Sequence, residues 1–268
     1  MPINSSHPQH AAHLPQWQRC RDAVAGSDAI KLRGVAYLPK LSGQSDEEYT
    51  AYKLRALWYG ASARTVQGLT GAVMRKDPTV EVPKALEEHL KDVTLSGISF
   101  TAFAKKVLEE VLITGRFGVL VDMPAVTHAV QRPYYAAYTA ESIVNWKAEM
   151  TNGVSMLVWV VLCEQVWVAK PDDPYQLEAV EQYRVLRMVE GHYEVETYRK
   201  SKVREGAWES QGVVIPTFRG TPLTFIPFCF FGPNEITPEI AKPPILDLVD
   251  VNLDHYRLSA DRKHGLHF

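Results

Sequence analysis

The sequence predicts an α+β fold, in which helices come first, antiparallel strands follow and a further helix closes the chain. Apolar residues recur at three- and four-residue steps over residues 45–76 and again over 99–114, which is typical of amphipathic helices. After Pro133 the pattern changes to short runs rich in β-branched and aromatic residues, separated by turn signals, which is typical of a strand meander. Because helical and strand patterns occupy separate parts of the chain, an alternating α/β arrangement is disfavoured.

The strongest helix signal begins at Ser45. Ser45 and Glu48 match a capping box, in which each side chain bonds to the other residue's free backbone N–H. The apolar pattern continues until Pro78, which predicts one long capped helix of roughly thirty residues. Glycines at positions 60, 68 and 71 fall inside it, and each costs ~1 kcal/mol relative to alanine. We therefore expect close packing of this helix against a neighbour, or a kink.

A helix–strand unit follows. A short helix is also expected earlier, at Leu14–Ala25, and a stronger one runs from Ser99 to Thr114. Gly115 is suited to end that helix, because glycine readily adopts the left-handed conformation of a C-terminal cap. The apolar run Phe117–Met123 comes directly afterwards and predicts a buried strand.

The second half of the chain is expected to form an antiparallel meander with one solvated face. Turns are expected at Glu190-Gly191 and Glu205-Gly206, and a closing helix after Pro243-Pro244. The strands are expected at Val154–Val168, Val180–Val189, Tyr193–Tyr198, Val213–Ile215 and Thr224–Phe231. This pattern divides the chain into a mainly helical part (1–130), a β-rich part (131–242) and the closing helix (243–268).

Composition excludes several classes of protein. The 268 residues carry a net charge of −2 with a pI near 6.5, which excludes a strongly basic nucleic-acid binder. No apolar run approaches the ~18–20 residues that a membrane-spanning helix needs. The three cysteines, Cys20, Cys163 and Cys229, are odd in number and far apart, which predicts reduced, buried thiols in a cytoplasmic protein.

The sequence contains none of the common catalytic motifs: no phosphate-binding loop, dinucleotide fingerprint, nucleophile elbow or HExxH. Asp122 is the one carboxylate that could carry chemistry, because it ends a predicted buried strand, where open sheets often hold a ligand or metal. Glu141 or Glu109 could supply a second carboxylate. An aspartate before a Met-Pro pair is more often a turn former, and we favour that interpretation.

Two groups of histidines suggest a metal site, but Pro8 and Pro15 interrupt the first group, and no cysteine lies near either group. The groups are His7, His10 and His13, and His255, His264 and His267. We expect them to be solvated side chains near the chain ends. We accordingly expect no catalytic, cofactor-binding or metal-ligating residues.

Aromatic side chains crowd the predicted β region. Few basic residues are interleaved with them, which disfavours a platform for single-stranded nucleic acid and favours core packing or a subunit interface. These residues are Tyr134, Tyr135, Tyr138, Trp146, Trp159 and Trp167.

Five segments, in order along the chain, carry a resemblance to a known family. They are VLEEVLITGRFGVLVD (Val107–Asp122), YYAAYTAESIVNW (Tyr134–Trp146), EQYRVL (Glu181–Leu186), GTPLTFIPFCFFGPN (Gly220–Asn234) and PPILDLVDVNLDHYRLSAD (Pro243–Asp261). Together they resemble the N-terminal, wing portion of a tailed-bacteriophage portal protein, from a branch described as conserved phage proteins of unknown function. The most telling piece is the PL-x-x-IP strand that leads to a helix carrying Asn252, Tyr256 and Ser259 in an N-x-x-x-Y-x-x-S pattern.

The resemblance implies a structural, non-enzymatic role. Portal proteins form a ring of about twelve identical subunits through head-to-tail contacts. The ring is the head–tail connector at one capsid vertex. It docks the terminase, which hydrolyses ATP, contacts capsid and tail connector proteins, and lets double-stranded DNA pass without tight binding. The implied location is the virion, and the host cytoplasm during assembly, without a membrane. Near-neutral charge suits such a conduit, since each neutralised phosphate adds affinity.

In the family, the closing helix leads to the stem, clip and crown, which this sequence does not include. No DNA-lining or terminase-docking residue is therefore carried over, and we expect a truncated frame, a prophage remnant or a split gene. Two other functions remain open. One is a stand-alone protein-binding module, and the other is a metal-dependent nuclease or phosphoesterase built on Asp122. If the portal interpretation holds, the glycine face of the Ser45–Lys76 helix is expected to pack between subunits.

Overall fold

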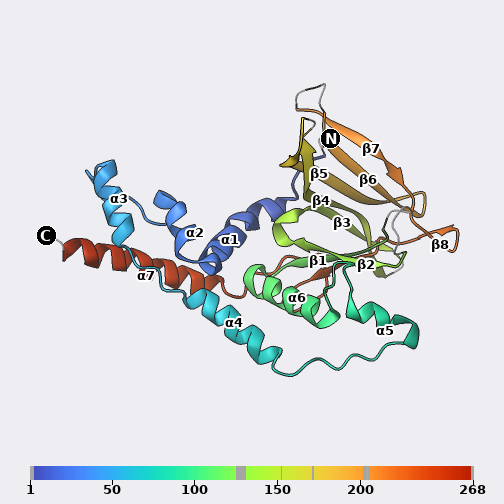
Figure 1. The fold of residues 1–268 in the computed structure, drawn as a ribbon, viewed down its shortest axis with the longest axis horizontal. Helices are drawn as coiled ribbons and strands as arrows, with labels where there is room; N and C mark the ends of the chain where they lie inside the picture. Colours follow the sequence, from blue (N-terminus) through green and yellow to red (C-terminus); the bar gives the residue numbers. More distant parts are fainter. Residues whose placement is uncertain are drawn as a thin grey trace. The chain divides into compact units, whose positions relative to one another are not determined.

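The computed structural model describes residues 3–124, 131–151, 153–170, 172–201, 204 and 206–266. The fold is α+β, as predicted (Figure 1). The chain forms two compact units. The unit that we call the β unit comprises Met1–Leu14, Gly118–Phe230 and Ile236–Glu239, and the helical unit comprises Pro15–Phe117, Phe231–Glu235 and Ile240–Phe268. The closing helix thus belongs to the same unit as most of the N-terminal helices.

The helical unit is built from α-helices of very different lengths. Their bounds are α1 (Pro8–Ala25, whose first residues belong to the β unit), α2 (Ser27–Leu32), α3 (Asp46–Arg55), α4 (Ala61–Val73), α5 (Lys84–Lys91), α6 (Phe100–Thr114) and α7 (Leu246–Gly265), with a 3₁₀ turn at Gly34–Ala36. The sequence did not predict α2 and α5, which are short. Helix α1 begins six residues before the predicted start, because Pro8 is well suited to the first position of a helix.

The prediction of one long helix from Ser45 is wrong. The capping box is present, since Ser45 Oγ accepts a hydrogen bond from the Glu48 backbone N–H (3.2 Å) and Glu48 Oε2 accepts one from the Ser45 N–H (2.8 Å). However, α3 ends at Arg55, because Ala56 adopts an extended conformation (φ −59°, ψ 134°), and α4 begins only after Gly60. The glycine pattern therefore marks a break at Gly60.

Helix α7 stabilises this break with side-chain hydrogen bonds. Ser259 Oγ accepts from the Leu57 N–H (2.9 Å) and lies 3.1 Å from the Leu57 carbonyl oxygen. The Asn252 amide donates to the Tyr59 carbonyl (2.8 Å). The Asn252 oxygen accepts from both the N–H (3.3 Å) and the hydroxyl (3.0 Å) of Ser62. Backbone groups that the interrupted helix leaves unpaired are thus satisfied by α7.

Tyr256 lies between these two polar side chains on α7 and is fully buried. Its ring meets Trp58 edge-to-face, with the ring centroids 6.0 Å apart. The three residues of the N-x-x-x-Y-x-x-S pattern therefore bind α7 to the residues between α3 and α4.

The close packing expected at the other glycines does not occur within the described chain. A Cβ atom added at Gly68 or Gly71 would meet no atom within 4 Å. Both glycines lie on the exposed side of α4. The hypothesis that this face packs against another subunit remains a prediction.

The connection from α6 into the β unit follows the sequence prediction. Ser99 caps α6, Gly115 adopts the left-handed conformation (φ 71°) at its end, and β1 begins two residues later. A side chain at Gly115 would also approach the Ala241 carbonyl oxygen to 3.0 Å, so both conformation and space require glycine. Helix and strand follow one another without a loop.

The β unit contains an antiparallel meander, as predicted, with strand order β3-β4-β5-β6-β7. A three-stranded sheet of order β10-β1-β2 and a two-stranded β8-β9 ribbon complete the unit. The strands are β1 (Phe117–Asp122), β2 (Tyr134–Thr139), β3 (Ile143–Thr151), β4 (Val154–Lys170), β5 (Asp173–Val189), β6 (His192–Lys200), β7 (Trp208–Val214), β8 (Thr217–Phe218), β9 (Thr221–Pro222) and β10 (Phe228–Phe231).

The structure tests one predicted turn and the last predicted strand of the meander. The Glu190-Gly191 turn is confirmed, whereas Glu205 lies outside the described residues. The strand expected at Thr224–Phe231 begins only at Phe228, because Pro227 has no N–H to donate to a ladder. Its carbonyl oxygen still accepts a hydrogen bond from the Val121 N–H (2.9 Å).

The aromatic side chains of the β unit divide into buried and exposed members. Tyr138 and Trp146 are buried, which confirms core packing for these two, whereas Trp167 is 68% exposed. The packing is tight at Gly118, where an added Cβ would lie 2.4 Å from the ring of Phe228.

The α7 hydrogen bonds predict a specific loss of stability. Asn252→Ala should lower the free energy of unfolding by roughly 2–3 kcal/mol, because it leaves several buried donors and acceptors unpaired. Urea unfolding followed by circular dichroism measures this. The control is Asp254→Ala, which alters an exposed side chain on the same helix and should cost little. Equal effects of the two substitutions would contradict the role assigned to Asn252.

Candidate functional site

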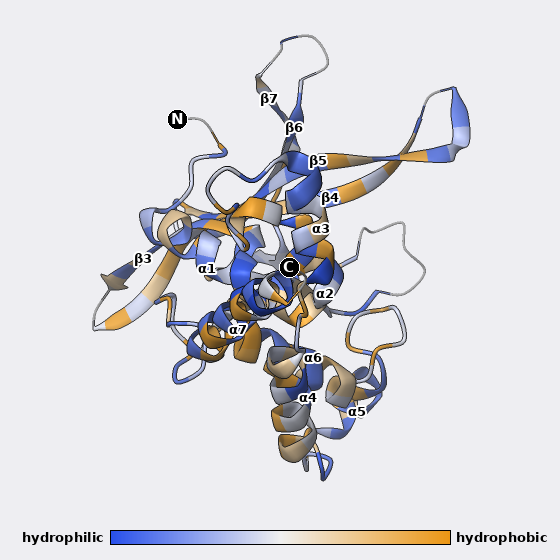
Figure 2. Ribbon diagram, turned by 90° about the vertical axis from the view of Figure 1, so that its left-hand side faces the viewer, coloured by the Kyte–Doolittle hydropathy of each residue, from blue (hydrophilic) through white to orange (hydrophobic). Residues whose placement is uncertain are grey.

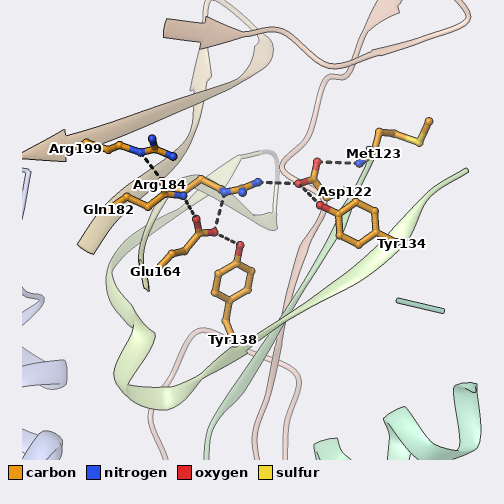
Figure 3. Close-up of polar contacts among 8 residues, drawn as sticks. All are labelled: Asp122, Met123, Tyr134, Tyr138, Glu164, Gln182, Arg184 and Arg199. Carbon is orange, nitrogen blue, oxygen red and sulfur yellow. Dashed lines mark hydrogen bonds and ion pairs between the residues drawn. The ribbon is translucent and has the colours of Figure 1, made fainter. Parts of the chain in front are cut away.

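The β unit contains a partly buried polar cluster centred on Arg184, and it includes the aspartate that the sequence singled out (Figure 3). We call it the Arg184 cluster, and its members are Asp122, Tyr134, Tyr138, Glu164, Gln182 and Arg184. These residues come from β1, β2, β4 and β5. The cluster therefore links the β10-β1-β2 sheet to the five-stranded meander.

Arg184 pairs with two carboxylates at once. Its Nη1 lies 2.7 Å from Asp122 Oδ2, and its Nε lies 2.8 Å from Glu164 Oε1. The three side chains are only 24%, 21% and 15% exposed, respectively. Ion pairs shielded from water in this way are screened much less by salt than surface pairs.

Further donors occupy the remaining positions around Asp122. The Tyr134 hydroxyl donates to Oδ2 (3.2 Å), and the Met123 backbone N–H donates to Oδ1 (2.8 Å). The second bond is the turn-forming contact that the sequence favoured for an aspartate at a strand end. Both carboxylate oxygens of Asp122 are therefore engaged.

Glu164 is held in a similar way. Its Oε1 accepts from the Tyr138 hydroxyl (2.6 Å), and its Oε2 accepts from the Gln182 amide (2.6 Å). The Gln182 oxygen in turn accepts from Arg199 Nε (3.0 Å), which extends the network to β6. Every carboxylate oxygen in the cluster thus has at least one N–H or O–H donor.

The strand register explains why these side chains meet. Glu164 on β4 lies directly opposite Gln182 on β5. Arg184 is two residues beyond Gln182, so its side chain emerges on the same face of the sheet and reaches the glutamate diagonally. Asp122 ends β1, where its side chain meets the guanidinium.

The charges within the cluster shift the pKa values of its members. Burial alone would lower the pKa of Arg184, but the surrounding Tyr138, Glu164 and Asp122 more than offset burial and raise it. Burial, reinforced by Glu164, raises the pKa of the Tyr138 hydroxyl, and burial together with Asp122 raises that of Tyr134. Both phenols therefore remain protonated donors at neutral pH.

This geometry favours a structural cross-link over a reactive centre. A general base or a metal ligand needs a carboxylate oxygen with an accessible lone pair, and here a guanidinium lies where a bound cation would have to sit. Among the described residues, no group of three or more histidines, cysteines, aspartates or glutamates is placed to hold a metal ion.

Neither predicted second carboxylate, Glu141 or Glu109, lies in the Arg184 cluster with Asp122. The carboxylate that shares Arg184 is Glu164, which the sequence reasoning missed. Glu141 instead accepts a hydrogen bond from His10 at its backbone carbonyl (3.0 Å). Glu109 lies on α6 in the helical unit, 4.0 Å from Lys105 Nζ. The sequence could have indicated Glu164, because a glutamate within the apolar run of β4 requires a hydrogen-bonding or charged partner.

The histidines that the structure describes form no common metal site, but the expectation that all of them are solvated is wrong. His10 is buried, and the ring of His7 stacks on Trp146 with centroids 4.0 Å apart. His13 Nδ1 donates to the Gln9 carbonyl (2.9 Å) within α1.

The second histidine group also takes part in packing. His255 and His264 meet tyrosine rings edge-to-face, at Tyr59 and Tyr52 respectively. His267 lies outside the described residues.

The cysteines differ in burial, so the prediction of three buried thiols is confirmed only for Cys20. Cys20 is buried, and burial raises the pKa of its thiol to about 12. Cys163 is half-buried, and burial together with Glu181 raises its pKa to about 11. Cys229 is exposed on β10. Thiols with such high pKa values are poor nucleophiles at neutral pH, so Cys20 and Cys163 are structural.

Comparison with known proteins adds no assignment: no family model matches the chain, and a search of curated proteins finds no relative. None of the helices in the described part of the chain combines the length and apolar character that crossing a lipid bilayer requires.

The Arg184 cluster predicts a pH-dependent defect. Arg184→Met should lower the free energy of unfolding by roughly 3–5 kcal/mol at neutral pH, because it leaves two carboxylates shielded from water without a counterion. In the variant, the folded state binds protons at these carboxylates more readily than the unfolded state does. Its stability should therefore rise as the pH falls from about 8 to about 5, and the deficit relative to the parent should narrow.

A matched control is Lys147→Met, on β3 of the same unit. Lys147 pairs with Glu149 (2.6 Å), and the two side chains are 51% and 53% exposed, so its loss should cost at most about 1 kcal/mol. Urea titrations at the two pH values measure both effects. A deficit for Arg184→Met that matches this control, or that does not change with pH, would show that the cluster is not a charged cross-link.

Proposed function

We propose that the chain is a structural subunit of a tailed-phage portal, which acts through protein–protein contacts rather than catalysis. The proposal starts from the ordered resemblance of five segments to the wing of portal proteins. In this function the subunits form a closed ring of about twelve copies at a capsid vertex. The ring would contact terminase, capsid and tail connector proteins, and double-stranded DNA would pass through it. The chain would then be part of the virion.

The observation that carries the proposal is the position of Asn252, Tyr256 and Ser259. These residues make up the most telling part of the resemblance, and in this chain all three contact the residues between α3 and α4. The pattern thus serves as a joint within a helical scaffold. A sequence motif retained for catalysis would instead direct its polar groups towards a ligand.

The Arg184 cluster supports the same interpretation. Asp122 is the carboxylate that the sequence indicated for hydrolytic chemistry. Its charge is neutralised by a guanidinium, and two further hydrogen-bond donors fix its position. This arrangement favours a structural subunit over a nuclease or phosphoesterase.

Exposed apolar side chains support self-association. A soluble surface normally scatters such residues singly, whereas contiguous patches mark contacts with other molecules. In the helical unit, Leu54, Leu57 and Leu258 are each more than half exposed, and in the β unit the same is true of Trp167, Tyr175 and Leu177. Each unit thus offers apolar surface for a neighbour.

The experiment that tests the proposal is native mass spectrometry of the purified chain over a range of concentrations. A ring of about twelve subunits of 30.2 kDa should appear as one discrete species of roughly 360 kDa. A discrete number of subunits is expected because head-to-tail contacts close only at a fixed rotation. A chain that remains a monomer or dimer at every concentration would contradict the portal function and favour a stand-alone binding module.

A further inference from the structure

The two longest strands extend beyond the sheet that they belong to. Strand β3 pairs with β4 only as far as Leu162, and β6 pairs with β5 only from Gln182 onwards. The described residues of Cys163–Lys170 and Asp173–Glu181 therefore form a two-stranded ribbon to which neither β3 nor β6 adds a ladder, and we call it the arm (Figure 2). An isolated two-stranded ribbon is only marginally stable in water.

One face of the arm is apolar and open to solvent. Trp167 lies opposite Ala179, and Ala169 lies opposite Leu177, so these four side chains share a face. Trp167 is 68% exposed and Leu177 is 57% exposed. Figure 2 shows the same character, with orange stretches along the ribbon and a blue end. Large apolar side chains on a marginal ribbon indicate a surface that another protein covers.

The end of the arm is acidic. From Lys170 to Glu178 it carries one basic residue, Lys170, and three acidic ones, so its net charge is −2. Asp172 and Asp173 lie at the end itself, whereas Glu178 lies on the face opposite Leu177. Lys170 is already engaged with the Gln176 side chain (3.1 Å). The arm therefore combines an apolar face with an acidic end.

The helical unit has a groove of complementary character. It has a volume of about 460 Å³ and lies along the C-terminal half of α7. Leu57, Leu258 and Leu266 give it an apolar lining, and Arg262 and Lys263 give it positive charge. None of the described side chains that line it is acidic. Leu258 is 60% exposed, so the described part of the chain leaves the groove accessible to another molecule.

We propose that the arm of one copy docks into the α7 groove of a second copy. The apolar face would cover the leucines, and Asp172 and Asp173 at the end of the arm would meet Arg262 and Lys263. Because the two surfaces differ, the contact is head-to-tail, which is the type of contact that a closed ring requires. This inference rests on the proposed function, since it names the interface of the same ring.

Charge reversal tests the contact on full-length chains. The arm variant is Asp172→Lys/Asp173→Lys, and the groove variant is Arg262→Glu/Lys263→Glu. Each alone should raise the concentration needed for assembly at least roughly tenfold, because like charges would face each other. An equimolar mixture should restore assembly, since each altered surface then finds an opposite charge on the other chain. Native mass spectrometry and light scattering read out the assembled mass.

Matched variants separate this effect from a general change in charge or folding. Glu87→Lys/Glu88→Lys makes the same change in charge as the arm variant, on the exposed helix α5, and should leave assembly unchanged. Val251→Asp alters an exposed position of α7 outside the groove and should also have no effect, whereas Leu258→Asp should prevent assembly. Circular dichroism should show the same folded signal for all variants.

The outcomes distinguish the two proposals. If the parent chain forms rings and both charge-reversal variants assemble as well as the parent, the arm–groove contact is wrong and the portal function stands. The parent could instead form open chains of subunits that are lost in each variant and return in the mixture. That result would confirm the arm–groove contact and contradict the closed ring. A parent that stays monomeric overturns both.

Discussion

The guanidinium of Arg184 joins the two larger sheets of the β unit electrostatically. Arg184 faces two carboxylates, Asp122 and Glu164, which belong to different sheets. Withdrawing three charges from water is costly, and the cost is met only because every carboxylate oxygen has a hydrogen-bond donor. Removing the arginine would leave two negative charges without a counterion where the two sheets meet, so it adds a charged link to their apolar packing. The same arrangement explains why the aspartate at the end of β1 is a poor candidate for hydrolysis.

The helical unit depends on hydrogen bonds between distant parts of the sequence. Asn252 and Ser259 of α7 pair with backbone groups of residues 57–62, which precede them by roughly 190–200 positions. These contacts allow the chain to leave the helix after Arg55 and to resume it at Ala61. The helical unit thus satisfies these backbone groups internally, while apolar side chains such as Leu54 and Leu258 remain exposed.

Local chemistry made much of this fold predictable. The Ser45 capping box, the left-handed Gly115, the Glu190-Gly191 turn and the meander follow from residues that are neighbours in sequence. The features that could not be predicted depend on long-range partners. The break after Arg55 is one example, because the pattern of apolar residues continues across it, and its stabilising partners lie on α7. In the candidate site, Asp122 was found from its place at a strand end. Glu164 and Arg184 were missed because their pairing is set by the β4–β5 register.

The central claim is that this chain is a scaffold subunit that assembles into a closed ring. Electron microscopy of the purified protein tests it most directly, because class averages show both closure and rotational symmetry. The account predicts rings of one fixed symmetry with a central opening, in which the α7 groove of each subunit meets the arm of the next. Separate particles of single-subunit size, or open filaments without closure, would contradict it.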